Sequence, residues 1–228
     1  MLKHILCPVH REGWLFLAIA AIVAFMLGKF SPHLGWIGAL VALWVAYFFR
    51  DPARVTPQRP GLVISPADGL VQSIVMAPLP PELGRGGELW QRVAVFMNVF
   101  DVHINRAPID ATIKEIKYIP GKFLNASLDK ASVDNERQIF VLSLADGREI
   151  VMVQIAGLVA RRILRWVNAG DAVKAGFRVG MIRFGSRVDV YLPAGTTIQA
   201  IEGQRVRAGE SVLADLRAQD AAWQGVRQ

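Results

Sequence analysis

The sequence contains very little cysteine: one residue, Cys7, among 228. A disulfide within the chain is therefore impossible, and a cysteine-based metal site is excluded. The four histidines (His4, His10, His33 and His103) include no pair with the spacing found in zinc peptidases. We therefore expect no metal. Acylation is a role compatible with Cys7, which lies near a hydrophobic run.

Acidic residues are also in short supply, because 19 Asp and Glu stand against 26 Lys and Arg, giving a formal net charge of +7. A basic chain suits an anionic partner, either nucleic acid or a membrane surface. The membrane is the preferred interpretation, because 53% of the residues are hydrophobic and the surplus lies in the first fifty. Each Lys or Arg close to an anionic leaflet contributes about 1 kcal/mol. We predict a lipid bilayer, and no nucleic acid, as a partner.

Two long apolar runs, Trp14–Leu27 and Leu34–Phe49, are separated by a short polar turn with helix breakers. We predict that residues 1–50 form a hydrophobic helical hairpin that either spans the bilayer or dips into one leaflet. The alternative is a pair of buried helices in a soluble core, but neither run shows the polar/apolar period of such helices. Basic residues flank both ends, so the positive-inside rule places the C-terminal domain on the cytoplasmic side of the cell membrane.

The remaining sequence changes character twice. Residues 51–60 contain three prolines and no apolar period, which predicts a linker or extended arm. Residues 61–228 contain short runs rich in Val and Ile that are punctuated by Gly and Pro. This spacing predicts a mainly β domain, a sandwich or small barrel. We expect one short helix near Gly157–Val167.

An internal repeat supports this fold class. Residues 169–179 and 201–212 share the pattern Gly-x-x-Val-x-Ala-Gly-x-x-Val, led by Gly170 and Gly203. The pattern is similar to that of biotinyl/lipoyl-type hammerhead barrels, which carry a modified lysine at the hairpin between the copies. A membrane-tethered adaptor or carrier of that kind is one functional alternative. It would require a lysine there, and the chain has none after Lys174.

The interval between the copies contains a Gly-Ser dipeptide, which alone usually marks a turn. It is accompanied by a series of further motifs, in this order: Ser65-Pro-Ala-Asp-Gly69, Asn98-Val-Phe-Asp-Val-His-Ile-Asn-Arg-Ala-Pro108, Gly121-Lys-Phe-Leu-Asn-Ala126, Asn135-Glu-Arg137, Gln154-Ile-Ala-Gly-Leu-Val-Ala-Arg-Arg-Ile163 and Arg183-Phe-Gly-Ser-Arg187. Taken together, from about Gly61 to Leu213, these motifs resemble the phosphatidylserine decarboxylases of the short bacterial and archaeal type.

The resemblance implies a proenzyme that cleaves itself between Gly185 and Ser186 into a large and a small chain. It also implies that Ser186 becomes a covalent pyruvoyl cofactor. This group would form a Schiff base with the amine of phosphatidylserine and accept electrons as CO₂ leaves, giving phosphatidylethanolamine. The residue types suit self-cleavage, because a serine hydroxyl can attack the preceding carbonyl and a glycine there permits its approach.

Further site residues follow from the same resemblance. His103 matches an Asp-x-His motif and is the candidate base and proton donor. Asp68 would orient or polarise His103 or the serine, although a turn-capping role is its alternative. Some family members carry a second histidine where this chain has Arg106, so His103 would serve both cleavage and decarboxylation.

The candidate substrate-binding residues are Arg161 and Arg162, as anion binders for the headgroup, with Lys122 and Asn125 in neighbouring motifs. An archaetidylserine-type lipid is an alternative substrate, because the tails lie outside the reacting centre. A serine hydrolase using Ser186 and His103 is a further alternative, but the sequence has no Gly-x-Ser-x-Gly elbow. A homo-oligomer is compatible with the sequence.

Overall fold

The computed structural model describes residues 7–122, 134–157, 162–183 and 186–218. These residues form two compact units. The first takes the described residues up to Ala53 together with the short segment Phe100–Val102, and the second takes the rest.

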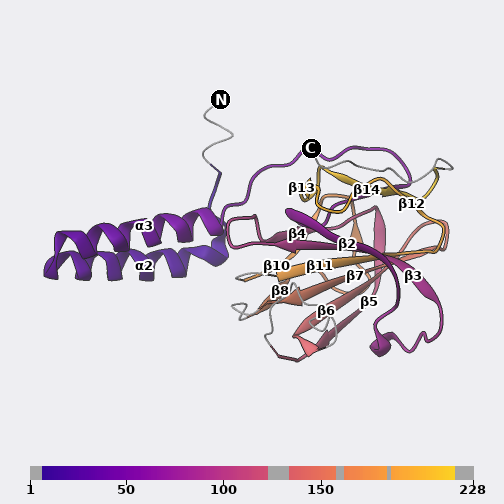
Figure 1. The fold of residues 1–228 in the computed structure, drawn as a ribbon, viewed down its shortest axis with the longest axis horizontal. Helices are drawn as coiled ribbons and strands as arrows, with labels where there is room; N and C mark the ends of the chain where they lie inside the picture. Colours follow the sequence, from indigo (N-terminus) through magenta and orange to yellow (C-terminus); the bar gives the residue numbers. More distant parts are fainter. Residues whose placement is uncertain (1–6, 123–133, 158–161, 184–185, 219–228) are drawn as a thin grey trace. The chain divides into compact units, whose positions relative to one another are not determined.

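The first unit is a helical hairpin of α2 (Arg11–Phe30) and α3 (Pro32–Phe48), which run antiparallel in Figure 1. The His10 side chain caps α2 by accepting the backbone N–H of Glu12 at 3.3 Å. Pro32 begins α3, where the missing N–H costs nothing. The predicted turn is therefore shorter than expected, because Ser31 alone separates the two helices.

Small residues bring the two helices close together. A Cβ on Gly35 would lie 2.9 Å from the Gly28 Cα, and one on Gly38 would lie 2.6 Å from the Ala24 Cα. The large side chains point outward, so only 6% of the apolar window of α2 is buried, at a mean hydropathy of 2.0. Small residues between helices and large apolar residues outside are typical of membrane helices. Among the described residues, α2 is the helix long and apolar enough to cross a bilayer.

The second unit is mainly β, as the sequence predicts (Figure 1). Its largest sheet has eight strands in the order β13 (Arg205–Val206), β2 (Gly69–Pro78), β3 (Leu89–Met97), β11 (Ser186–Leu192), β7 (Glu149–Ala156), β6 (Arg137–Ser143), β5 (Ala111–Ile119) and β9 (Ala172–Val173). Two three-stranded sheets complete it: β1 (Leu62–Ile64), β14 (Val212–Asp215) and β12 (Thr197–Ile198), and β4 (Ile104–Arg106), β10 (Arg178–Ile182) and β8 (Ile163–Arg165). A 3-10 turn, η1 (Pro81–Leu83), lies between β2 and β3.

The central strand β11 is buried on both faces. Val188, Val190 and Leu192 belong to the main hydrophobic cluster. Tyr191 belongs to a second cluster. Because successive side chains of a strand point to opposite faces, these two clusters mark the two faces of the large sheet. β11 therefore lies in the middle of the domain.

The two copies of the repeat adopt the same conformation. Gly170 and Gly203 have φ values of 93° and 83°, and the second glycines, Gly176 and Gly209, have φ values of 81° and 77°. Positive φ explains why each copy needs two glycines. In each copy a two-residue strand is followed by a turn and then a longer strand, β9 to β10 and β13 to β14.

The expectation of a short helix near Gly157–Val167 was wrong in its described part. Ile163–Arg165 forms β8, which pairs with β10. The strand has only three residues, Ile163-Leu164-Arg165, which are too few for periodicity to separate a strand from a helix. Cross-strand hydrogen bonds to β10 decided the outcome.

Candidate active site

The predicted nucleophile, Ser186, is the first residue of β11. It lies opposite Met97 of β3 on one side and opposite Ala156 of β7 on the other. Directly opposed residues of antiparallel strands project to the same face. Because Met97 and Ala156 belong to the main cluster, the Ser186 side chain points into the main core of the domain. The serine is fully buried.

The hydroxyl of Ser186 has no hydrogen-bond partner among the described residues. Leaving a buried hydroxyl unpaired costs about 1–3 kcal/mol, so such a group calls for an explanation. A hydroxyl kept free of competing hydrogen bonds is available for reaction. The unpaired hydroxyl therefore makes position 186 compatible with a group derived from this serine.

The predicted base, His103, is also fully buried. It directly precedes β4, and its carbonyl oxygen accepts the N–H of Ile182 at 3.3 Å. Ile182 ends β10, the strand that leads to Ser186. This hydrogen bond holds the histidine backbone beside the segment that carries the predicted cleavage site.

Asp68 lies just before β2, in a position fixed by its neighbours. A Cβ on Gly69 would lie 2.0 Å from the carbonyl oxygen of Phe96, so the chain requires glycine there. The N–H of Arg106 bonds to the carbonyl of Pro66 at 2.9 Å. These contacts hold the segment of Asp68 beside the end of β3 and beside Arg106, the last residue of β4.

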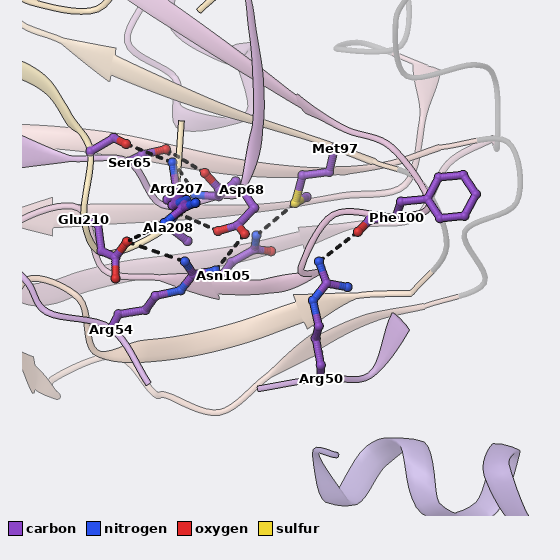
Figure 2. A network of polar contacts seen from close by, with 12 residues as sticks. Arg50, Arg54, Ser65, Asp68, Met97, Phe100, Asn105, Arg207, Ala208 and Glu210 are labelled. Atoms are coloured by element: carbon purple, nitrogen blue, oxygen red, sulfur yellow. Dashed lines mark hydrogen bonds and ion pairs between the residues drawn. The ribbon is translucent and has the colours of Figure 1, made fainter. Parts of the chain in front are cut away.

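Figure 2 shows two partners of the Asp68 carboxylate. One oxygen accepts the N–H of Ala208 at 2.7 Å, and the other is ion-paired with Arg54 at 2.7 Å. Arg54 also lies 3.6 Å from Glu210. Both Arg54 and Asp68 are largely buried, so the guanidinium and carboxylate charges are partly shielded from water.

Asp110 is the counterpart of Asp68 in the other half of the domain. Its carboxylate accepts the N–H of Ala175 at 2.8 Å and pairs with Lys174 at 2.8 Å. Ala175 and Ala208 occupy the same position in the two repeat copies. Burial alone would raise the pKa of Asp110, but hydrogen bonds from Lys174 and Ala175 outweigh it and lower the pKa. Both aspartates therefore bind the N–H of an alanine far away in the sequence, which differs from the local turn cap that was the alternative interpretation of Asp68.

The Asn-Glu-Arg motif supports the strand end opposite Ser186. The amide of Asn135 donates to the carbonyl of Ala156 at 2.7 Å, and the carbonyl of Glu136 accepts the N–H of Ala156 at 2.9 Å. The carboxylate of Glu136 accepts the N–H of Ile163 at 3.2 Å. Exposed Lys122 bonds to this motif through its backbone, since its carbonyl accepts the N–H of Glu136 at 3.0 Å.

A buried chain of amides, to which the sequence assigned no role, lies beside the serine. The Gln154 amide donates to the Asn105 carbonyl oxygen at 2.7 Å, and the Asn105 amide lies 3.6 Å from the Met97 sulfur. Gln138 approaches Gln154 at 3.4 Å. One signal could have identified Gln154: it is the single polar residue in an otherwise apolar strand interior, a position that apolar packing does not explain.

Arg162, a predicted headgroup-binding residue, is exposed and borders a hollow of about 510 Å³. The hollow is lined by Ile116, Tyr118, Gln138, Arg162, Ile163 and Arg165. The carbonyl of Arg162 accepts the N–H of Arg183 at 3.2 Å, three residues before Ser186. Burial, together with the charge of Glu136, raises the pKa of Tyr118. A tyrosine phenol is in any case neutral at pH 7 and can donate a hydrogen bond. Two arginines and a phenol suit an anionic group.

The opposite face of β11 carries a buried ion pair. Arg187 bonds to Asp189 at 2.7 Å and 3.0 Å, and both side chains are almost completely buried. Burial and the charge of Asp189 raise the pKa of Tyr191 to about 12. These side chains point away from the serine and stiffen the strand that begins with it.

Three predicted site residues, Gly185, Asn125 and Arg161, lie outside the described residues. Among those that are described, no group of three or more His, Cys, Asp or Glu is placed to hold a metal ion.

Comparison with known proteins identifies the family of this chain independently of the site geometry. The family model for phosphatidylserine decarboxylase matches residues 41–214. The protein named phosphatidylserine decarboxylase proenzyme in Paramagnetospirillum magneticum is 57% identical over 223 residues, covering 98% of this chain and 93% of its own length. Its namesake in Cereibacter sphaeroides is 56% identical over 225 residues, covering 99% and 97%. The match in Xanthobacter autotrophicus is 55% identical over 214 residues, covering 94% and 91%.

These relatives favour neither the adaptor nor the hydrolase alternative. They match almost the whole chain, including the hairpin and the repeat, and they carry one name. The chain belongs to the phosphatidylserine decarboxylase family.

Proposed function

We propose that this chain is made as a proenzyme, cleaves itself before Ser186, and decarboxylates phosphatidylserine to phosphatidylethanolamine. The observation that carries the proposal is the buried Ser186 hydroxyl without a partner among the described residues, at the start of the central strand. The names of the relatives support both the proenzyme and the substrate.

Self-cleavage follows from the residue types. The Ser186 hydroxyl adds to the carbonyl carbon of Gly185, and the peptide C–N bond breaks to leave an ester and a free amine. Elimination of that ester returns a carboxylate on Gly185 and leaves dehydroalanine at position 186. Tautomerisation and hydrolysis then release ammonia and leave a pyruvoyl group. His103 is the candidate base for the hydroxyl proton and for the elimination.

The pairing of β11 would keep residue 186 in place after the bond breaks. Residues 186–192 pair with β3, and residues 186–191 pair with β7, so both pairings could persist in the cleaved protein. The pyruvoyl group would supply an electrophilic carbonyl and an electron sink to the substrate amine. The chain's own contribution is a core that excludes water, a buried His103 to hold the proton, and Arg162 at the adjacent hollow to bind the anionic headgroup.

The hairpin supports a membrane location for this activity. The substrate never leaves the bilayer, so the enzyme must meet the headgroup at the membrane surface. An apolar α2 suits a membrane anchor. The basic flanks favour a catalytic domain on the cytoplasmic side.

Intact mass spectrometry of the purified protein tests the proposal. We expect two fragments, one ending at Gly185 and one beginning at residue 186 with a blocked N-terminus. Ser186→Ala should give a single full-length chain without decarboxylase activity, because alanine has no nucleophile. Ser143→Ala, at the end of β6, is the matched control and should cleave like the wild type. A single full-length chain in active wild-type protein would disprove the self-processing mechanism.

A further inference from the structure

The segment that precedes His103 belongs to the hairpin unit. Phe100–Val102 forms one compact unit with the described residues up to Ala53, although β3 and β4 on either side belong to the other unit. The Arg50 side chain connects this segment to the hairpin. Arg50 donates to the carbonyl of Phe100 at 2.8 Å, as Figure 2 shows, and to the carbonyl of Tyr47 at 2.7 Å. Its guanidinium also lies 3.7 Å from the centre of the Tyr47 ring.

Arg50 is itself fixed at the base of the hairpin, where the first residues of α2 and the last residues of α3 meet. Val9 and Arg50 form an isolated β-bridge. The N–H of His10 bonds to the carbonyl of Phe49, and the N–H of Asp51 bonds to the carbonyl of Pro8, both at 2.8 Å. Backbone hydrogen bonds therefore hold Arg50 in place, so the side chain that binds Phe100 does not come from a frayed helix end.

The base of the hairpin presents exposed aromatic side chains. Phe100 is 60% exposed, whereas the next two residues of its loop are buried. Trp14, at 66%, and Tyr47, at 49%, are exposed at the same end, and the Trp14 indole is oriented by the carbonyl of Val9. Aromatic rings beside an arginine, at the end of an apolar helix pair, are characteristic of the membrane–water interface.

We propose that Phe100 is part of the membrane-contacting surface, and that Arg50 is a positioning residue that holds the Phe100–Val102 loop at the interfacial end of the hairpin. The occupant of this surface is the lipid bilayer, because Phe100 belongs to the same compact unit as the apolar hairpin and is bonded to the end where Trp14 and Tyr47 are exposed. The loop leads directly into His103. The inference rests on the proposed function: it places the segment before the candidate base where a lipid headgroup must arrive.

Site-specific labelling tests the membrane contact without using activity. The full chain carries Cys7→Ser and either Phe100→Cys or, as the control, Phe177→Cys in the β domain, where the phenylalanine is 54% exposed. Each variant is labelled with a fluorophore and reconstituted into vesicles of neutral and anionic phospholipid. We expect lipid-borne nitroxide to quench the label at position 100 and aqueous iodide to quench the label at 177. Iodide quenching at 100, or protection of that label from both quenchers, as a second copy or another protein would give, overturns the proposal.

Kinetics test the positioning role. Phe100→Ser should raise the KM for phosphatidylserine in vesicles by about tenfold, because an interfacial aromatic contact is lost. Decarboxylation of a monomeric short-chain phosphatidylserine should stay within twofold. Arg50→Lys keeps the charge but loses the ability to bond two carbonyls at once. Both Arg50→Lys and Arg50→Ala should raise the KM on vesicles while sparing the monomeric substrate, and the rise should be smaller for Arg50→Lys. Equal losses on both substrates, or none on vesicles, contradict the proposal. A wild type that neither cleaves nor decarboxylates would instead contradict the proposed function, and the labelling result would still stand.

Discussion

Asp68 and Asp110 allow the catalytic and structural roles of one carboxylate to be separated. Each caps the alanine N–H of its repeat copy, and each pairs with a cation. They differ in surroundings, because Asp68 is largely buried with Arg54 whereas Asp110 and Lys174 are exposed. Asparagine keeps the capping oxygen at either position and removes only the charge.

We predict that Asp68→Asn slows self-cleavage at least tenfold, whereas Asp110→Asn cleaves at the wild-type rate. A tenfold change corresponds to about 1.4 kcal/mol in the barrier. The time course of fragment formation on a gel gives the rates, and thermal unfolding of each variant shows whether both are folded at the assay temperature. Equal rates in the two variants would leave Asp68 with only the structural role of binding the Ala208 N–H and Arg54.

The sequence pointed to some residues of the candidate site and missed others, for a physical reason. Ser186, His103 and Asp68 could be proposed from the sequence because each stands in a distinctive local motif. The amide chain of Asn105, Gln154 and Gln138 was not, because its members are far apart in the sequence and meet only through strand pairing.

At the scale of elements, glycines mark where strands approach one another. Gly69 has φ near 156° and sits where a Cβ would meet the carbonyl oxygen of Phe96. Gly147, in the turn between β6 and β7, has φ near 83°, but nothing lies within 4 Å of its missing Cβ. The backbone conformation disfavours a side chain at both positions. At Gly69 a side chain would also clash with the neighbouring strand.

We therefore predict that Gly147→Ala costs about 1–2 kcal/mol, the penalty of a left-handed alanine. Gly69→Ala should cost more than about 3 kcal/mol, because β2 must move away from β3. Thermal unfolding of both variants in the uncleaved Ser186→Ala background provides the comparison. Similar losses for the two would mean that the approach of β2 to β3 is not tight.

Strand and helix assignments also show what local sequence can determine. Strong alternating or apolar runs such as β7 and β11 were predictable. The segment Ile163–Arg165 was expected to be helical but pairs as β8, since three residues carry too little periodicity and the pairing partner, β10, comes later in the chain.

At the scale of the whole molecule, we predict that the protein behaves as an integral membrane protein in which both fragments remain together. Helix α2 has 20 residues, so it is about 30 Å long, which matches the hydrocarbon core of a bilayer. The small fragment supplies β11 to the middle of the large sheet, so it should not leave after cleavage.

Washing membranes with 1 M NaCl or alkaline carbonate should therefore release neither fragment, whereas detergent should release both. Salt at that concentration reduces the Debye length to about 3 Å and would detach a protein held by its charge alone. Immunodetection of both fragments in pellet and supernatant gives the result. Release by salt would show that the basic surface, and not the hairpin, holds the enzyme.

The sequence by itself determined the hairpin, the mainly β class, the repeat and the order of the motifs, because each depends on residue types within a few positions of one another. Only the tertiary structure decided that Ser186 lies buried between Met97 and Ala156, and that the Asn135–Glu136 motif supports that strand end. It also decided that Asp110 is the counterpart of Asp68 and that Arg50 clamps the loop before His103. These relations join residues tens of positions apart, and strand register and packing, rather than local preference, set them.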